Sequence, residues 1–125
     1  MKKILIIEDD PSLQKTLVAK LKASGYQTVL AGDGEEAIKV FKKEKPALIL
    51  CDLILPKKSG LEVIEEIKIN QHSEVPLIVL SNLDQAQDLE TAKRLGAVEY
   101  ILKSDISLRD LIIRIAALTK APNGA

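Results

Sequence analysis

Aromatic side chains are scarce in this sequence, which contains one Phe, two Tyr and no Trp among 125 residues. Proteins that bind single-stranded nucleic acid often stack the bases on aromatic rings. The formal net charge is also zero, so no basic field attracts a phosphate backbone. We therefore expect no direct binding to nucleic acid. Hydrophobic residues still make up 46% of the chain, and they are mostly aliphatic, which is typical of a parallel sheet covered by helices.

Cysteine and long apolar runs are also nearly missing. The single cysteine, Cys51, excludes an internal disulfide and favours a reducing compartment. The apolar run at residues 4–7 follows two lysines, and it is too short for a signal peptide or a membrane span. We predict a soluble cytoplasmic protein that does not associate with membranes.

What the chain does contain is a strand pattern followed by a helix pattern, repeated five times. We expect strands at residues 4–7, 28–31, 47–51, 75–80 and 98–102, and helices that begin near Asp10-Pro11, Asp33, Ser59, Asp84 and Ser107. Strict alternation predicts a doubly wound α/β domain with a parallel sheet and right-handed crossovers. The length suits one domain, which we place at residues 1–119, with 120–125 as a tail or the start of a linker.

Polar side chains follow four of these strands. They are Glu8, Asp9 and Asp10 after the first strand, Asp52 after the third, Ser81 after the fourth and Lys103 after the fifth. Ligands of open α/β sheets bind beyond the carboxyl ends of the strands, so we expect these side chains to meet at one edge.

Crowded carboxylates repel one another unless a cation is present. Mg²⁺ suits such a site, because it accepts one or two carboxylates, keeps several waters and bridges to phosphate. The sequence therefore predicts metal-dependent phosphoryl chemistry. Asp52 is the expected nucleophile, and Lys103 and Ser81 are expected to contact the transferring oxygens.

Four segments of the sequence resemble the motifs of response-regulator receiver domains of the chemotaxis type. They are ILIIEDDP, LILCDLILPKKSG, LIVLSN and EYILKS, and the resemblance extends from residue 2 to about residue 119. It implies a flavodoxin-like sheet of five strands in the order 2-1-3-4-5 with five helices. It also implies that Asp52 accepts a phosphoryl group from a histidine kinase or a phosphotransfer protein, and that the chain catalyses only its own phosphorylation and autodephosphorylation.

The resemblance assigns further roles to single residues. Asp9 would ligate Mg²⁺ (or Mn²⁺) directly and Glu8 through water, while Asp52 and the backbone carbonyl of Ile54 complete the metal site. Ser81 and Tyr100 match the switch hydroxyl and the switch aromatic. Their movement would change the face built from the fourth helix, the fifth strand and the fifth helix. The implied partner is a downstream protein or a fused output domain, with the chain as a monomer or an activation-dependent dimer.

The sequence also departs from the family pattern. Ser104 follows Lys103 where proline is common, and a cis bond before a residue other than proline costs about 2.5–4 kcal/mol, so the geometry of this loop is left open. Asn82 stands where a small residue is usual and would narrow access to the phosphoryl group. Ile54 and Leu83 flank the site in the resemblance, and their apolar character predicts a long-lived phosphoryl group.

Three other functions fit the sequence less well. A receiver fold used only for interaction would not need the complete set of acids, hydroxyl and lysine. A hydrolase of the haloacid dehalogenase type needs a second acid two residues after the nucleophile, where Ile54 stands. A flavin protein needs a glycine- and hydroxyl-rich loop after the first strand, and Glu8, Asp9 and Asp10 would repel its phosphate.

Several of the same residues also have plain structural interpretations. Asp10 is expected to be a helix cap, and Cys51 a core residue. Tyr100 alone would pack at an edge of the sheet. His72 has no visible metal-ligand partner in the sequence.

Overall fold

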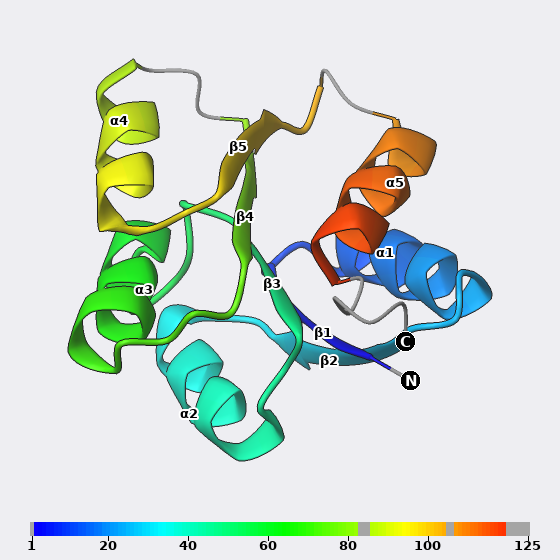
Figure 1. The fold of residues 1–125 in the computed structure, drawn as a ribbon, viewed down its shortest axis with the longest axis horizontal. Helices are drawn as coiled ribbons and strands as arrows, with labels where there is room; N and C mark the ends of the chain where they lie inside the picture. Colours follow the sequence, from blue (N-terminus) through cyan, green and yellow to red (C-terminus); the bar gives the residue numbers. More distant parts are fainter. Residues whose placement is uncertain (1, 83–85, 105–106, 120–125) are drawn as a thin grey trace.

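The computed structural model describes residues 2–82, 86–104 and 107–119. Its elements in chain order are β1 (Lys3–Ile7), α1 (Pro11–Ala23), β2 (Gln27–Ala31), α2 (Gly34–Glu44), β3 (Leu48–Cys51), α3 (Gly60–Ile64), the π-helix η1 (Glu65–Asn70), β4 (Leu77–Ser81), α4 (Ala86–Leu95), β5 (Glu99–Leu102) and α5 (Leu108–Thr119). The strands form one parallel sheet in the order β2-β1-β3-β4-β5 (Figure 1). This confirms the predicted fold.

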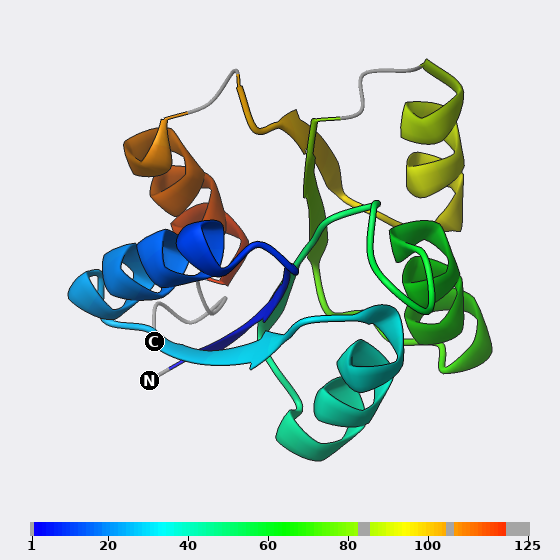
Figure 2. The same ribbon diagram turned by 180° about the vertical axis from the view of Figure 1, so that it is seen from behind.

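Helices cover both faces of the sheet. Figures 1 and 2 show α1 and α5 on one side and α2, α3 and α4 on the other. Side chains alternate between the two faces, so that Leu5 and Ile7 pack toward α2 and α3, while Ile4 and Ile6 pack toward α1 and α5. Because β1, β3 and β4 are buried on both faces, their sequences are nearly continuous apolar runs. No helix in the described ranges has the length and apolar character needed to cross a bilayer.

Local capping signals set the helix ends. The Asp10 side chain accepts the Ser12 N–H at 2.9 Å and starts α1, as the sequence predicts. Ser59 and Glu62 form a reciprocal capping box at the start of α3. Gly25 and Gly96 follow α1 and α4 with φ angles of +95° and +120°, which glycine adopts without strain.

The third helix differs from the simple helix expected after Ser59. Its second half, η1, is a π-helix, in which the Gln71 N–H bonds the Glu66 carbonyl at 3.0 Å, five residues back. The apolar periodicity does not distinguish the two helix types over so short a segment. The expected start of the fourth helix at Asp84 lies outside the described residues, and α4 is described from Ala86.

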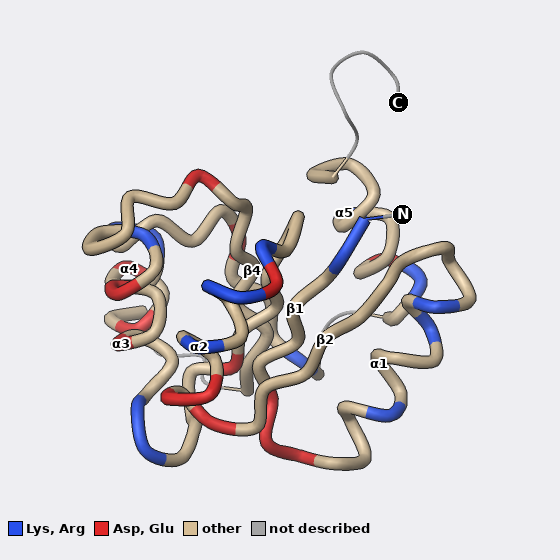
Figure 3. The backbone as a smooth tube through the Cα atoms, turned by 90° about the horizontal axis from the view of Figure 1, so that it is seen from below, with Lys and Arg blue, Asp and Glu red and all other residues tan. Residues whose placement is uncertain are grey.

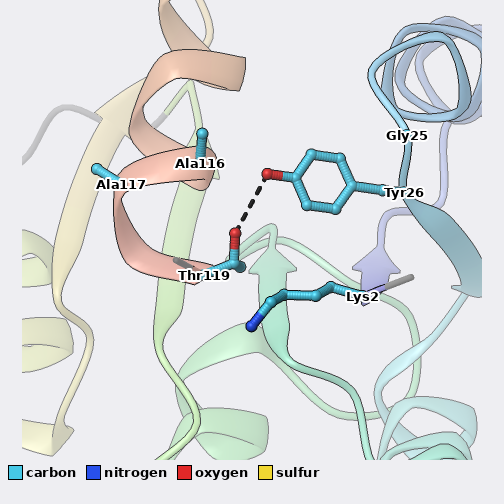
Figure 4. Close-up of a pocket in the computed structure, with 6 residues that line it drawn as sticks. All are labelled: Lys2, Gly25, Tyr26, Ala116, Ala117 and Thr119. Carbon is cyan, nitrogen blue, oxygen red and sulfur yellow. Dashed lines mark hydrogen bonds between the residues drawn. The ribbon is translucent and has the colours of Figure 1, made fainter. Parts of the chain in front are cut away.

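At the amino-terminal edge of the sheet, Tyr26 connects the α1–β2 junction to the end of α5 (Figure 4). The Tyr26 hydroxyl lies 3.2 Å from Thr119 Oγ1, and Thr119 Oγ1 donates to the Ile115 carbonyl at 2.8 Å. Because that bond uses the only proton of Thr119, Tyr26 must be the donor to Thr119. A pocket of about 470 Å³ beside this pair is lined by Lys2, Gly25, Tyr26, Ala116, Ala117 and Thr119.

Candidate functional site

The candidate site lies at the carboxyl ends of the four neighbouring strands β1, β3, β4 and β5. In the register, Ile7 lies beside Cys51 and Cys51 beside Val79. The ladder continues past the strand ends, since the Asp52 N–H bonds the Ile7 carbonyl at 3.0 Å and the Lys103 N–H bonds the Ser81 carbonyl at 2.9 Å. Residues that are distant in sequence therefore leave adjacent strands at the same edge.

Asp52 is the centre of this arrangement and is 7% exposed. Its Oδ1 atom accepts the Ser81 hydroxyl at 3.0 Å and the Ile54 N–H at 3.1 Å. Its Oδ2 atom accepts the Lys103 ammonium at 2.8 Å. Three donors thus hold one carboxylate in a fixed orientation, with both oxygens at a partly buried edge.

Lys103 bridges two carboxylates. Its Nζ atom lies 2.8 Å from Asp52 Oδ2 and 2.9 Å from Glu8 Oε1. Burial disfavours its charged form, but the two carboxylates outweigh burial and hold the pKa of Lys103 above its ordinary value. Lys103 is therefore a cation at neutral pH.

Glu8 is buried, and its Oε2 atom accepts the Asp10 N–H at 3.1 Å. Burial raises the pKa of Glu8, although the Lys103 ammonium opposes this. The Gln14 side-chain amide donates to the Glu8 backbone carbonyl, which holds the start of the β1–α1 loop. Sequence reasoning missed Gln14, and no motif in the sequence indicates it.

Glu8, Asp9 and Asp52 each offer a carboxylate oxygen, and these oxygens lie within 4.8 Å of one another. Figure 3 shows the acidic stretch that follows β1 on the way to α1. Three carboxylates against the single charge of Lys103 leave two negative charges, which one divalent cation would neutralise. An all-oxygen set of this kind suits Mg²⁺ or Mn²⁺.

The remaining predicted residues lie around this cluster. Ile54 contacts Asp52 through its N–H, while its side chain is 60% exposed. Ser81 is buried at the end of β4, and Tyr100 is half-buried on β5 beside Val79. Asn82 is exposed. Leu83 lies outside the described residues.

The structure also bears on the features with plain interpretations. No cis peptide bond occurs in the described ranges, so the Lys103–Ser104 bond is trans. Cys51 is fully buried, and burial together with Asp52 and Glu8 raises the pKa of its thiol. Asp10 caps α1.

The loop after Asp52 packs closely on the start of α2, which the sequence analysis did not anticipate. The Gly34 N–H bonds the Pro56 carbonyl at 3.2 Å. A Cβ atom on Gly34 would lie 2.3 Å from the Lys58 carbonyl oxygen, and one on Gly60 would lie 2.2 Å from the Asp52 carbonyl oxygen. Both positions require glycine for close backbone approach. A lone glycine such as Gly34 at a helix start carries no such signal in the sequence, whereas Gly60 belongs to the receiver-like segment LILCDLILPKKSG.

Comparison with known proteins agrees with this geometry. The profile of the response regulator receiver domain family matches residues 4–116. The chain is 39% identical over 118 residues to the probable transcriptional regulator ycf27 of Porphyridium aerugineum, and the aligned region covers 94% of this chain and 48% of that protein. It is 37% identical over 119 residues to the alkaline phosphatase synthesis transcriptional regulatory protein PhoP of Bacillus subtilis, and the aligned region covers 95% of this chain and 49% of that protein.

A solved structure is similar over nearly the whole chain. The BeF3-activated N-terminal receiver domain of Klebsiella pneumoniae RstA matches with a TM-score of 0.87 and 28% identity, over 95% of this chain and 99% of that one. The chain spans about half the length of the curated relatives named above. Response regulators are signalling proteins rather than conventional enzymes. The chain belongs to the response regulator receiver domain family of two-component signalling proteins.

Proposed function

We propose that this receiver domain is a switch controlled by phosphorylation of Asp52, and that a histidine kinase or a phosphotransfer protein supplies the phosphoryl group. The observation that carries this proposal is the environment of the Asp52 carboxylate. It is buried, contacts the Lys103 ammonium at 2.8 Å and the Ser81 hydroxyl at 3.0 Å, and lies beside two further acids. A strand-end carboxylate without a function would not need this set of partners.

The chemical step uses the Asp52 side chain as the nucleophile. An oxygen of Asp52 attacks the phosphorus atom of a phosphohistidine and forms a P–O bond. The P–N bond breaks, and its electron pair stays on the imidazole nitrogen. A carboxylate nucleophile needs no general base. In a separate step, water attacks the phosphorus atom, the bond to Asp52 breaks, and the free carboxylate and inorganic phosphate result, which is the autodephosphorylation expected of the family.

Lys103 and Ser81 are the residues that respond to the new group. The ammonium is positioned to pair with the transferring oxygens, and the hydroxyl can exchange its bond to Asp52 for a bond to a phosphoryl oxygen. The phosphoryl group adds negative charge and strong acceptors. We propose that Tyr100 follows Ser81, and that the α4-β5-α5 face shifts between two packings as a result.

The acid cluster is suited to a divalent cation. We propose that Asp9, Asp52 and the carbonyl of Ile54 hold Mg²⁺ or Mn²⁺ directly, and that Glu8 holds it through water. When bound, the cation supplies positive charge against the phosphoryl oxygens. Lys103 neutralises part of the cluster through its bonds to Glu8 and Asp52.

The relatives support a proposal about output. Both curated relatives are named as transcriptional regulators and are about twice as long as this chain. We propose that residues 1–119 are the signalling unit, that 120–125 begin a linker or tail, and that a fused domain or a separate partner carries the output in the cytoplasm. Direct contact of this domain with nucleic acid or membrane is not part of the proposal. Its state is a monomer or an activation-dependent dimer.

Beryllofluoride with Mg²⁺ tests the proposal, because the pair imitates an acyl phosphate. We expect large amide shifts in NMR spectra around Asp52, Ser81 and Lys103, together with a higher melting temperature. Asp52→Ala should abolish both effects, whereas Asp33→Ala, which removes a helix-capping acid, should keep them. A native domain that does not respond would favour a receiver fold used only for interaction.

A further inference from the structure

A second hollow, outside the phosphoacceptor cluster, lies between α2 and the α3–η1 helix. Its volume is about 410 Å³, and it is lined by Glu35, Ile38, Lys39, Lys42, Lys58 and Glu66. In Figure 3 basic residues are visible along α2. We call this hollow the α2–α3 groove. The proposed phosphorylation of Asp52 uses none of its residues.

The lysines of the groove differ from its acids in their contacts. Within the described part of the chain, the ammonium groups of Lys39, Lys42 and Lys58 make no ion pair within 4.0 Å and no hydrogen bond. Both acids already have partners. The Glu35 carboxylate pairs with Lys57, with 3.9 Å between Glu35 Oε1 and Lys57 Nζ.

Glu66 is the other acid. It accepts the side-chain amides of Asn70 at 2.9 Å and Gln71 at 3.1 Å. These bonds lower the pKa of Glu66, and nearby Lys42 and Lys58 lower it further. The groove therefore presents three ammonium groups without a direct carboxylate partner, and together with its two carboxylates it carries one net positive charge.

The groove has a defined shape because its two walls are joined. Lys58 N–H bonds the Pro56 carbonyl at 2.8 Å, and the same carbonyl accepts the Gly34 N–H at the start of α2. A Cβ atom on Gly34 would lie 2.4 Å from Lys58 Cβ, so the loop is seated directly on the helix. Lys39 and Lys42 are three residues apart and share a face of α2. Ile38 is half-buried and adds an apolar surface between the charges.

We infer that the α2–α3 groove is a docking surface for an acidic segment of a partner protein. Carboxylates of that segment would bind Lys39, Lys42 and Lys58, and an apolar side chain would contact Ile38. The ammonium groups favour an acidic occupant, and a peptide fits better than single-stranded nucleic acid because no aromatic ring lines the groove to stack a base. The inference does not depend on phosphorylation of Asp52.

A synthetic peptide is a direct probe. Three repeats of Glu-Glu-Glu-Leu carry the expected charge and apolar anchor, and a peptide without leucine or one with Lys in place of Glu serves as a comparison. The native domain, titrated at about 50 mM salt, should show amide shifts that cluster on the groove. The variant Lys39→Gln, Lys42→Gln, Lys58→Gln should bind about tenfold more weakly, since each exposed pair contributes roughly 0.5 kcal/mol.

A matched control comes from α1. Lys15, Lys20 and Lys22 are also exposed, and the structure records no ion pair for them within the described ranges. Their triple replacement with glutamine removes the same charge and should change affinity less than twofold. Thermal unfolding checks that both variants are folded, and Lys39→Gln alone gives a smaller loss in the same direction if the triple variant is unstable.

Four outcomes contradict the inference. The first is no binding of the acidic peptide at 1 mM, which corresponds to a binding free energy weaker than about −4 kcal/mol. The second is an equal loss of affinity in the two triple variants. The third and fourth are that the lysine peptide, or a single-stranded 12-nucleotide DNA, binds the same residues more tightly than the acidic peptide does. Because the domain is titrated without beryllofluoride or Mg²⁺, failure here leaves the proposed switch intact.

Discussion

Replacing Lys103 with methionine tests how strongly one ammonium group holds the acid cluster together. The native side chain is 19% exposed and contacts Glu8 and Asp52, whose side chains are 4% and 9% exposed. At an effective dielectric constant of about 20, opposite charges about 3 Å apart attract by roughly 5 kcal/mol before desolvation. Methionine keeps much of the packing but leaves two buried carboxylates without their shared cation.

The expected loss of stability follows from burial. Removing one partner of a buried ion pair typically costs about 3–5 kcal/mol, and the residual exposure of Lys103 favours the lower end. We expect the free energy of unfolding to fall by about 3 kcal/mol at pH 7.5 in EDTA. For a domain of this size that corresponds to a decrease of about 12 °C in melting temperature.

The loss should depend on pH in a defined direction. Without the ammonium, the pKa of Glu8, which burial already raises, should rise further above its value in the unfolded chain. A group with a raised folded pKa stabilises the fold below its unfolded pKa, and that contribution is lost as the pH rises through the folded pKa. The difference between native and Lys103→Met proteins should therefore be small near pH 4.5 and grow toward pH 8. Millimolar Mg²⁺ should restore part of it.

Thermal unfolding followed by circular dichroism measures these effects. Lys15→Met, which replaces an exposed lysine on α1, should change the melting temperature by less than about 2 °C. The Lys103 ammonium is not what stabilises the cluster if Lys103→Met melts within 2 °C of the native domain at pH 7.5. The same conclusion follows if the loss of stability in Lys103→Met is equal at pH 4.5 and pH 8. A rescue by Mg²⁺ concerns the metal proposal separately.

Three further predictions concern other parts of the molecule. Tyr26→Phe removes the donor to Thr119 and should lower the free energy of unfolding by about 1 kcal/mol, measured by urea unfolding; no change would mean that the bond adds nothing. The pKa of Asp33 is lowered, chiefly by a backbone N–H in the first turn of α2, so its capping contribution is present above its ordinary pKa and is lost as the pH falls. Asp33→Asn should therefore flatten the acid side of the curve of unfolding free energy against pH, and an unchanged curve would contradict this. The double variant Ile54→Asn, Leu83→Glu should shorten the phosphoryl half-life, which radiolabel retention measures; an unchanged or longer half-life rejects the role of these side chains in hindering water.

Much of the fold was accessible from local patterns. The alternation of strand and helix, the caps at Asp10 and Ser59, and the glycines at 25 and 96 depend on residues near one another in sequence, so periodicity and capping signals locate them. The strand order did not come from these patterns. Periodicity tells which residues are buried but not which strand lies beside which, and the order was expected only from the resemblance to receiver domains.

The site divides in the same way. The sequence by itself determined that Glu8, Asp52, Ser81 and Lys103 each stand at a strand end, because the end of an apolar run is a local property. Only the tertiary structure decided that Lys103 bonds both Asp52 and Glu8, since two side chains 51 residues apart meet through the parallel register of β3, β4 and β5.

The tertiary structure also decided features that no motif announces. The close seating of the loop after Asp52 on Gly34 and the charged groove between α2 and α3 both join segments from different crossovers. Each segment satisfies its own helical or turn pattern whatever its neighbour is. The contact between them arises from how two helices pack on one face of the sheet, which is a property of the folded chain.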